Sequence, residues 1–248
     1  MWDAKSGVRG VAFDEGDNRA LFITDMTMGQ KCTLVILDLA KIKRRIELDQ
    51  VDTILADVRD DRAEFVLPGS KATCAAWGKL NTHIVTGHED GSIKYWCPKT
   101  GEQLASSHIQ TGQIMDIQFG IGREYFIAAS KDHSAIMYDS ADLKPLRNFN
   151  TERPCNAASI SPTHPYIIVG GGQDAMNVTT SSARDGKFET CFYHVAFQEE
   201  IGRVRGHFGP INTLAFHPSG RGFASGSEDG FVRLHFFDDD YFEFNHSV

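Results

Sequence analysis

The chain has 248 residues, of which 41% are hydrophobic and 23% charged, and 25 basic residues stand against 33 acidic ones. This composition permits a packed core and argues against extended disorder. The net charge of −8 argues against non-specific binding to nucleic acid or anionic membranes, because such binding depends on clustered positive charge. The apolar stretch 32–40 contains Asp38 and is far shorter than the roughly 20 residues of a membrane span. We therefore expect no membrane association.

The five cysteines are widely spaced, and no two of them form a C-x-x-C pair. An odd number of cysteines with this spacing does not predict a disulfide framework or a structural zinc site. The first residues also lack the apolar segment of a secretory signal. We expect reduced thiols, no bound metal and a cytoplasmic location.

A short pattern, apolar–x–x–apolar–x–large apolar, occurs five times along the chain. The copies are Val8/Val11/Phe13, Ala72/Ala75/Trp77, Ile114/Ile117/Phe119, Cys155/Ala158/Ile160 and Ile211/Leu214/Phe216. An aspartate follows the last residue of each copy after 12 to 14 residues. These aspartates are Asp25, Asp90, Asp132, Asp174 and Asp229. Offsets this regular indicate an internal repeat.

Each repeat predicts strands. The β-prone runs that precede the aspartates are Ala20–Thr24, His83–Thr86, Tyr125–Ala129, Tyr166–Gly170 and Phe223–Ser225. Asp90-Gly91 and Asp229-Gly230 have the sequence of tight hairpins, with third strands expected behind them. Because no stretch has sustained helical periodicity, we predict an all-β chain with about four strands per repeat.

The repeats have the spacing of a β-propeller. Trp77 and Phe119 are 42 residues apart, and Phe119 and Ile160 are 41 apart, near the ~40–45 of a WD40 blade. Larger spacings imply insertions within 26–70 and 175–187. We predict a single WD40 propeller domain with about five blades plus a partial blade. Its parts are 1–7 (remnant of a blade), 8–70 (blade with insertion), 71–110, 111–152, 153–206 (blade with insertion) and 207–248 (last blade).

WD40 blades contain a buried network of His, Ser or Thr, Asp and Trp that ties their strands together. The candidate members are Thr86, Asp90 and Trp96, then His108, Asp132 and Tyr138, then His207, Ser225 and Asp229. The last unit has His235 where a Trp is expected, and the fourth lacks most of the set. We expect a structural role for these residues.

Met1–Gly7 parallels Tyr95–Gly101, the end of a third strand. Trp2 lies only 11 residues before Phe13, whereas 22 or 23 residues separate the corresponding positions of later units. The outer strand of that blade is expected to be missing. An N-terminally truncated product or an incomplete gene model would explain this, and a rearranged five-bladed ring is the alternative.

The C-terminal half carries specific motifs: RVRGHFGPIN at 203–212, AFHP at 215–218, GSEDG at 226–230 and DYFEF at 240–244. With TERP at 151–154 and GGGQDAMNVTT at 170–180, they make the chain resemble the family of subunit i of eukaryotic translation initiation factor 3, also called the TGF-beta receptor-interacting protein. The resemblance implies a seven-bladed propeller that acts as a non-enzymatic scaffold in translation initiation. It also implies subunits b and g as partners, and the small ribosomal subunit through the complex.

No catalytic or cofactor-binding residue is predicted. His88-Glu89-Asp90-Gly91 does not match H-E-x-x-H, and no G-K-[ST] follows the glycines at 170–172. Two other functions stay open: a WD40 signalling adaptor at a receptor kinase, and a propeller hydrolase with paired carboxylates.

Two segments are candidates for partner contact. The polar insertion of the fourth unit offers Asp174, Asn177, Thr179, Thr180 and Arg184. The basic run Lys41–Arg45 is expected to be a solvated insertion loop, with a contact to ribosomal RNA or to an acidic partner as the alternative. We expect no direct sequence-specific binding to nucleic acid.

Overall fold

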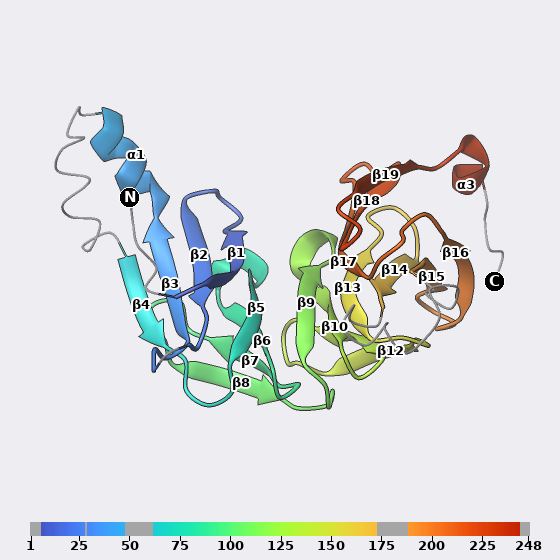
Figure 1. Cartoon of the computed structure of the whole chain (residues 1–248). Coiled ribbons are helices and arrows are strands. Elements are labelled where there is room, and N and C mark those ends of the chain that lie inside the picture. The colour runs from blue at the N-terminus through green and yellow to red at the C-terminus, as the bar shows by residue number, and fades with distance from the viewer. Residues whose placement is uncertain (1–5, 28, 48–61, 173–187, 244–248) are drawn as a thin grey trace. The chain divides into compact units, whose positions relative to one another are not determined.

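The computed structural model describes residues 6–27, 29–47, 62–172 and 188–243 (Figure 1). These residues form antiparallel sheets of consecutive strands, four sheets with four strands and one with three. The predicted all-β class is confirmed, and the four-stranded sheets are consistent with a WD40 propeller. The number of blades stays a prediction.

The chain divides into two compact units, which are described separately. The first comprises Met1–Ile117, Gly122–Glu124 and Asp139–Lys144. The second comprises Gln118–Ile121, Tyr125–Tyr138 and Pro145–Val248. The single propeller domain and its blade boundaries stay a prediction.

The first two sheets lie in the first unit. The first sheet contains β1 (Val8–Phe13), β2 (Arg19–Thr24), β3 (Thr33–Asp38) and β4 (Arg62–Val66), in that order. The second contains β5 (Ala72–Trp77), β6 (Ile84–His88), β7 (Ile93–Trp96) and β8 (Gln103–Ser107), with a 3-10 turn at Lys79–Asn81. The neighbouring sheets join where Trp77 donates its indole N–H to the carbonyl of Ala12 at 3.3 Å.

The other three sheets follow along the chain. The third contains β9 (Ile114–Phe119), β10 (Tyr125–Ser130), β11 (Ser134–Asp139) and β12 (Pro145–Asn150), with a 3-10 turn at Ile121–Arg123. The fourth contains β13 (Cys155–Ile160), β14 (Tyr166–Gly171), β15 (Thr190–His194) and β16 (Glu200–Val204). The fifth contains β17 (Ile211–Phe216), β18 (Gly222–Ser227) and β19 (Val232–Phe236), and helix α3 (Asp239–Glu243) follows it.

The basic run lies in helix α1 (Leu39–Glu47), so the expected loop at Lys41–Arg45 is wrong. Asp38 begins the helix, because its Oδ1 accepts the backbone N–H of Lys41 at 3.0 Å and satisfies one of the free N–H groups of the first turn. Leu, Ala, Lys and Arg are good helix formers, which explains why the run continues as a helix. None of the helices among the described residues is long and apolar enough to cross a membrane.

The two Asp-Gly pairs form tight turns, as predicted. Gly91 and Gly230 have φ values of +84° and +83°, a conformation that glycine adopts without steric cost. The preceding aspartates complete the turns, because Asp90 accepts the backbone N–H of Ser92 and Asp229 that of Phe231, both at 3.0 Å.

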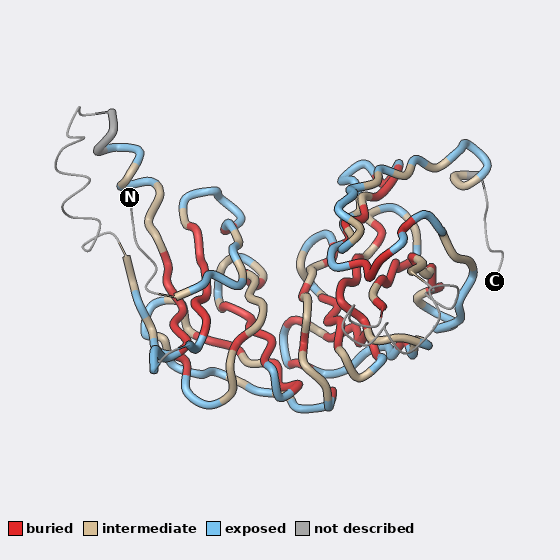
Figure 2. The backbone as a smooth tube through the Cα atoms, in the orientation of Figure 1, coloured by how far each residue is buried: buried red, intermediate tan, exposed pale blue. Residues whose placement is uncertain are grey.

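The core follows the strands of each unit (Figure 2). In the first unit the fully buried side chains include Leu21, Leu34, Trp77 and Trp96. The second unit has one cluster that runs through β10, β13 and β14 and another shared by the fourth and fifth sheets. The first residue of the repeat is buried in every copy after the first, because it packs against the preceding sheet.

Candidate functional site

A hydrogen-bonded chain of side chains crosses the fifth sheet. His207 lies with Nδ1 3.0 Å from Oδ2 of Asp229 and Nε2 2.8 Å from Oγ of Ser225. Ser225 Oγ is also 3.2 Å from Nε2 of His235, which lies at the position where a Trp was expected. Ser225 thus links His235 to His207, and His207 links Ser225 to Asp229. We call this chain the fifth-sheet relay.

The charge of Asp229 is held by its surroundings. Burial opposes its ionisation, but the backbone N–H groups of Phe208 and Phe231 and the imidazole of His207 outweigh this effect. The pKa of Asp229 is therefore lowered. Arg233 Nη1 adds an ion pair at 3.1 Å from the same carboxylate.

The second sheet contains a related chain of side chains, the second-sheet relay. Trp96 donates its indole N–H to Oγ1 of Thr86 at 2.7 Å, and Thr86 Oγ1 lies 2.8 Å from Nε2 of His88. His88 Nδ1 lies 2.8 Å from the carbonyl of Ser70. All three side chains are buried. Asp90 is exposed and caps its own turn through Ser92.

His88 is a member of this relay that the sequence analysis did not select. It lies two residues after Thr86, where the side chains of a strand return to the same face. That periodicity is the signal that could have found it. Burial lowers the pKa of His88, which favours the neutral imidazole.

Asp132 and Tyr138 were the candidates on the third sheet, and His108 was the candidate before it. Asp132 Oδ1 accepts the backbone N–H of Ser134 at 3.1 Å and its hydroxyl at 2.5 Å. Tyr138 is buried and stacks on Phe126, with ring centroids 5.4 Å apart. His108 is exposed, whereas Gln110, two residues later, is buried.

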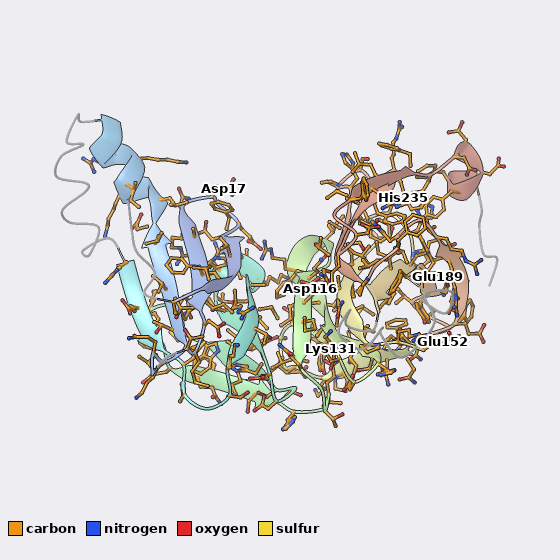
Figure 3. All side chains as sticks on the ribbon, viewed as in Figure 1. Asp17, Asp116, Lys131, Glu152, Glu189 and His235 are labelled. Atoms are coloured by element: carbon orange, nitrogen blue, oxygen red, sulfur yellow. The ribbon has the colours of Figure 1, made fainter. Side chains whose placement is uncertain are left out.

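The predicted partner residues Asp174, Asn177, Thr179, Thr180 and Arg184 lie outside the described residues. A pocket lies among the described residues of the fourth sheet. Gly171 and Glu189, which are described, line this pocket together with residues 151–155 and side chains of β15 and β16. Figure 3 labels Glu189 and Glu152, which lie on the same flank of the second unit.

Arg203 is the centre of the polar contacts in this pocket. Its guanidinium lies 3.1 Å from Glu152, 3.2 Å from Glu189 and 2.9 Å from Glu200. Arg205 binds the other oxygen of Glu189 at 2.6 Å. Three carboxylates thus share two guanidinium groups. We call this set the Arg203 cluster.

The carboxylate contacts keep the Arg203 cluster charged. The hydrogen bonds that Arg203 donates to Glu200 and Glu152 raise its pKa. Burial disfavours the charge of Glu189, but its bonds to Arg203 and Arg205 outweigh that penalty and lower its pKa. Such bidentate and shared guanidinium contacts hold the side chains in a fixed geometry.

The two thiols of the pocket are poor nucleophiles. Burial raises the pKa of Cys155 to about 12 and that of Cys191 to about 11. Both thiols are therefore protonated at neutral pH, and the thiolate is the reactive form of cysteine.

The described residues contain no group of three or more His, Cys, Asp or Glu side chains that could hold a metal ion. Their five cysteines are present as free thiols.

Comparison with known proteins identifies the family. The family model described as EIF3I matches residues 1–247. Curated relatives with the name eukaryotic translation initiation factor 3 subunit I cover nearly the whole chain. The relative from Botryotinia fuckeliana is 46% identical over 250 residues, which are 100% of this chain and 71% of the relative. Those from Taeniopygia guttata and Homo sapiens are 44% and 42% identical over 255 residues, each covering 98% of this chain and 75% of the relative. The chain belongs to the family of eukaryotic translation initiation factor 3 subunit I.

Proposed function

We propose that this chain is a non-enzymatic scaffold subunit of the translation initiation factor 3 complex. Through that complex it supports assembly of the preinitiation complex on the small ribosomal subunit, in the cytoplasm. The observation that carries the proposal is the match of nearly the whole chain to relatives with that name. Subunits b and g are the proposed partners.

The physical role is to present preorganised surfaces. The side-chain relays of the second and fifth sheets and the Arg203 cluster fix their strands through buried or shared hydrogen bonds. A partner that docks on such a surface does not have to pay for ordering it, which improves affinity without any bond chemistry.

The proposed partner surface combines the predicted residues of the insertion with the pocket that contains Glu189 and Arg203. Asp174 and Asn177 follow the pocket residue Gly171 closely, and Arg184 precedes Glu189 by five residues. We propose that a partner segment bound by Asp174, Asn177, Thr179, Thr180 or Arg184 also contacts the Arg203 cluster.

Affinity purification of the full chain from cells tests the function. Mass spectrometry is expected to recover subunits b and g, and sucrose gradients to place the chain with the small ribosomal subunit. Recovery of a receptor kinase without these subunits would contradict the proposal and favour a signalling adaptor.

The partner surface has its own test. The double variant Asp174→Lys/Arg184→Glu reverses two charges at constant net charge, and we expect it to recover several-fold less subunit b. The matched control Asp142→Lys/Lys144→Glu reverses an exposed ion pair of the first unit and is expected to leave recovery unchanged. Full recovery with the double variant would exclude this surface while leaving membership of the complex intact.

A further inference from the structure

Arg233 joins the fifth-sheet relay at its charged end. Its Nη1 lies 2.7 Å from Nδ1 of His207 and 3.1 Å from Oδ2 of Asp229. Nδ1 of His207 also lies 3.0 Å from the same Oδ2. A guanidinium only donates hydrogen bonds, and an ionised carboxylate only accepts them. Nδ1 therefore faces a donor and an acceptor, and it can bond to only one of them in a given protonation state.

Ser225 meets a similar choice at the other end of the His207 ring. Its Oγ lies 2.8 Å from Nε2 of His207 and 3.2 Å from Nε2 of His235, which Figure 3 labels. The hydroxyl has one hydrogen, which it donates to one of these nitrogens while it accepts from the other. In the second-sheet relay the direction is fixed, because the indole N–H of Trp96 can only donate. With an imidazole at position 235, either direction satisfies the hydroxyl.

Two complete sets of hydrogen bonds follow when both imidazoles are neutral. In the arginine state, Arg233 donates to Nδ1 of His207, His207 donates from Nε2 to Ser225, and Ser225 donates to His235. In the carboxylate state, His235 donates to Ser225, Ser225 donates to Nε2 of His207, and His207 donates from Nδ1 to Asp229. The states differ in which ring nitrogen of His207 carries the hydrogen.

The arginine state is favoured for neutral imidazoles. Asp229 does not need His207 there, because it accepts the backbone N–H groups of Phe208 and Phe231, each at 3.0 Å, and pairs with Arg233. In the carboxylate state, by contrast, a hydrogen on Nδ1 would point at the guanidinium N–H 2.7 Å away. Two donors that face each other repel, so Arg233 must then withdraw from Nδ1.

Uptake of one proton removes the choice, whichever imidazole receives it. An imidazolium carries a hydrogen on both ring nitrogens. If His207 is charged, Nδ1 therefore carries a hydrogen directly. If His235 is charged, it can only donate to Ser225, so Ser225 donates to Nε2 of His207 and the hydrogen of His207 lies on Nδ1. In both cases Nδ1 bonds to Asp229 and Arg233 leaves it.

We propose that the fifth-sheet relay is a two-state proton switch, in which uptake of one proton moves Nδ1 of His207 from Arg233 to Asp229. In the described part of the chain, the charged groups that contact these imidazoles are Arg233 and Asp229, and the ring of Phe223 stacks on His235 with centroids 4.5 Å apart. Burial lowers the pKa of His235, as do the charges of His207 and Arg233, which keeps this imidazole neutral at neutral pH.

The switch has a local consequence outside the relay. The guanidinium of Arg233 lies over the ring of Phe231, 5.3 Å from its centroid. Phe231 follows the Asp229-Gly230 turn, and its backbone N–H is held by Asp229. Release of Arg233 from His207 therefore changes the contacts of this turn while the carboxylate that anchors it is retained.

Nitrogen NMR of the imidazoles in the full chain tests the proposal, because the chemical shift of a ring nitrogen shows whether it carries a hydrogen. His207→Gln and His235→Gln chains assign the signals. At neutral pH, Nε2 of His207 is expected to carry the hydrogen and Nδ1 to lack one. Nδ1 is expected to gain a hydrogen as the pH is lowered to about 5. A hydrogen on Nδ1 already at neutral pH would overturn the proposal.

Two variants are expected to adopt the carboxylate state at neutral pH. Arg233→Met removes the competing donor, and His235→Trp supplies an indole N–H that can only donate to Ser225. In each folded variant, Nδ1 of His207 should carry a hydrogen without any acid. The controls His217→Gln and Arg221→Met, at exposed positions of the same unit, should leave the His207 signals unchanged. If Nδ1 lacked a hydrogen in either folded variant, Arg233 and Asp229 would not compete for it and the proposal would fail.

Discussion

The relays of the second and fifth sheets both link the second and third strands through side-chain hydrogen bonds, but they end on different groups. Both run from a ring nitrogen on the third strand through a hydroxyl on the second strand to an imidazole. In the second sheet the imidazole ends on the backbone carbonyl of Ser70, whereas in the fifth it ends on the carboxylate of Asp229. The hydrogen-bonded connection between the second and third strands is thus retained, while the group at its end changes from a neutral carbonyl to a charged carboxylate.

The two imidazoles also come from different places in the repeat. His88 pairs with Ala72, in the register that Ser227 occupies opposite Ile211. Both side chains contact a backbone carbonyl before the first strand, Ser70 for His88 and Gly209 for Ser227. His207 instead precedes the first strand itself. The repeat therefore keeps the positions of these polar groups, while different residues supply them in different sheets.

The largest expected difference between the relays is in packing. Trp96 is almost completely buried in the core of the first unit, while His235 is partly exposed. Trp96→Ala should cost about 3–5 kcal/mol of unfolding free energy, because it leaves a large cavity. His235→Ala should cost clearly less. Urea unfolding of both variants measures this, and equal losses would mean that the relays are packed alike.

Removing the central hydroxyl is the next largest effect. Thr86→Val retains the shape of the side chain but leaves the buried indole N–H of Trp96 without its acceptor. We expect a loss of about 1–3 kcal/mol in unfolding free energy. Thr100→Val, at an exposed threonine, should change stability by less than about 0.5 kcal/mol. A Thr86→Val chain as stable as the control would show that the second-sheet relay does not stabilise the fold.

Because Asp229 is charged and His88 is neutral in the folded chain, the two relays are expected to lose stability in different pH ranges. The lowered pKa of Asp229 gives stability that is complete above its unfolded pKa near 3.8 and is lost as pH falls below it. The lowered pKa of His88 gives stability that is complete above about 6.5 and declines as pH falls below that value.

Two variants separate these windows. Asp229→Asn should lose its stability difference from the unmodified chain only in acid below about pH 4. His88→Gln should show a smaller loss of stability between pH 7.5 and 5.5 than the unmodified chain does. Thermal unfolding across pH measures both, and Asp240→Asn, at an exposed carboxylate, is the control. Identical pH profiles for all variants would remove the distinction between the relays.

The smallest expected effect concerns His108. Because its side chain is exposed, His108→Ala should change the unfolding free energy by less than about 0.5 kcal/mol. Gln110→Ala, at the buried position two residues away, should cost more. A larger loss at His108 would show that it joins a relay in the third sheet as the repeat pattern suggested.

Strands and turns were predictable from local sequence. Short β-prone runs located second strands such as Tyr166–Gly171 within a residue or two of their ends, because a strand that is buried on both faces is apolar along its length. The Asp-Gly pairs located two turns, because those turns require a positive φ that glycine adopts readily. Helix α1 was missed because its basic residues resembled a solvated loop, although Asp38 already offered a capping side chain.

The site was less predictable, because its parts are distant in sequence. Glu152, Glu189, Glu200 and Arg203 come from three separate segments, and no spacing rule connects them. His88 belonged to a motif that was weighed only as a metal or catalytic signature. Its partner Thr86 is two residues away on the same strand, but the carbonyl of Ser70 comes within reach only once β5 and β6 are paired.

By itself, the sequence determined the all-β class, the five copies of the repeat and the family resemblance, since each depends on residue types at short or regular spacing. Only the tertiary structure decided which imidazole enters each relay, which carboxylates surround Arg203, and which repeat residues are left exposed. These features depend on which sheet lies against a given face. The burial and hydrogen bonding of a residue are set by the neighbouring sheet as much as by the residue itself.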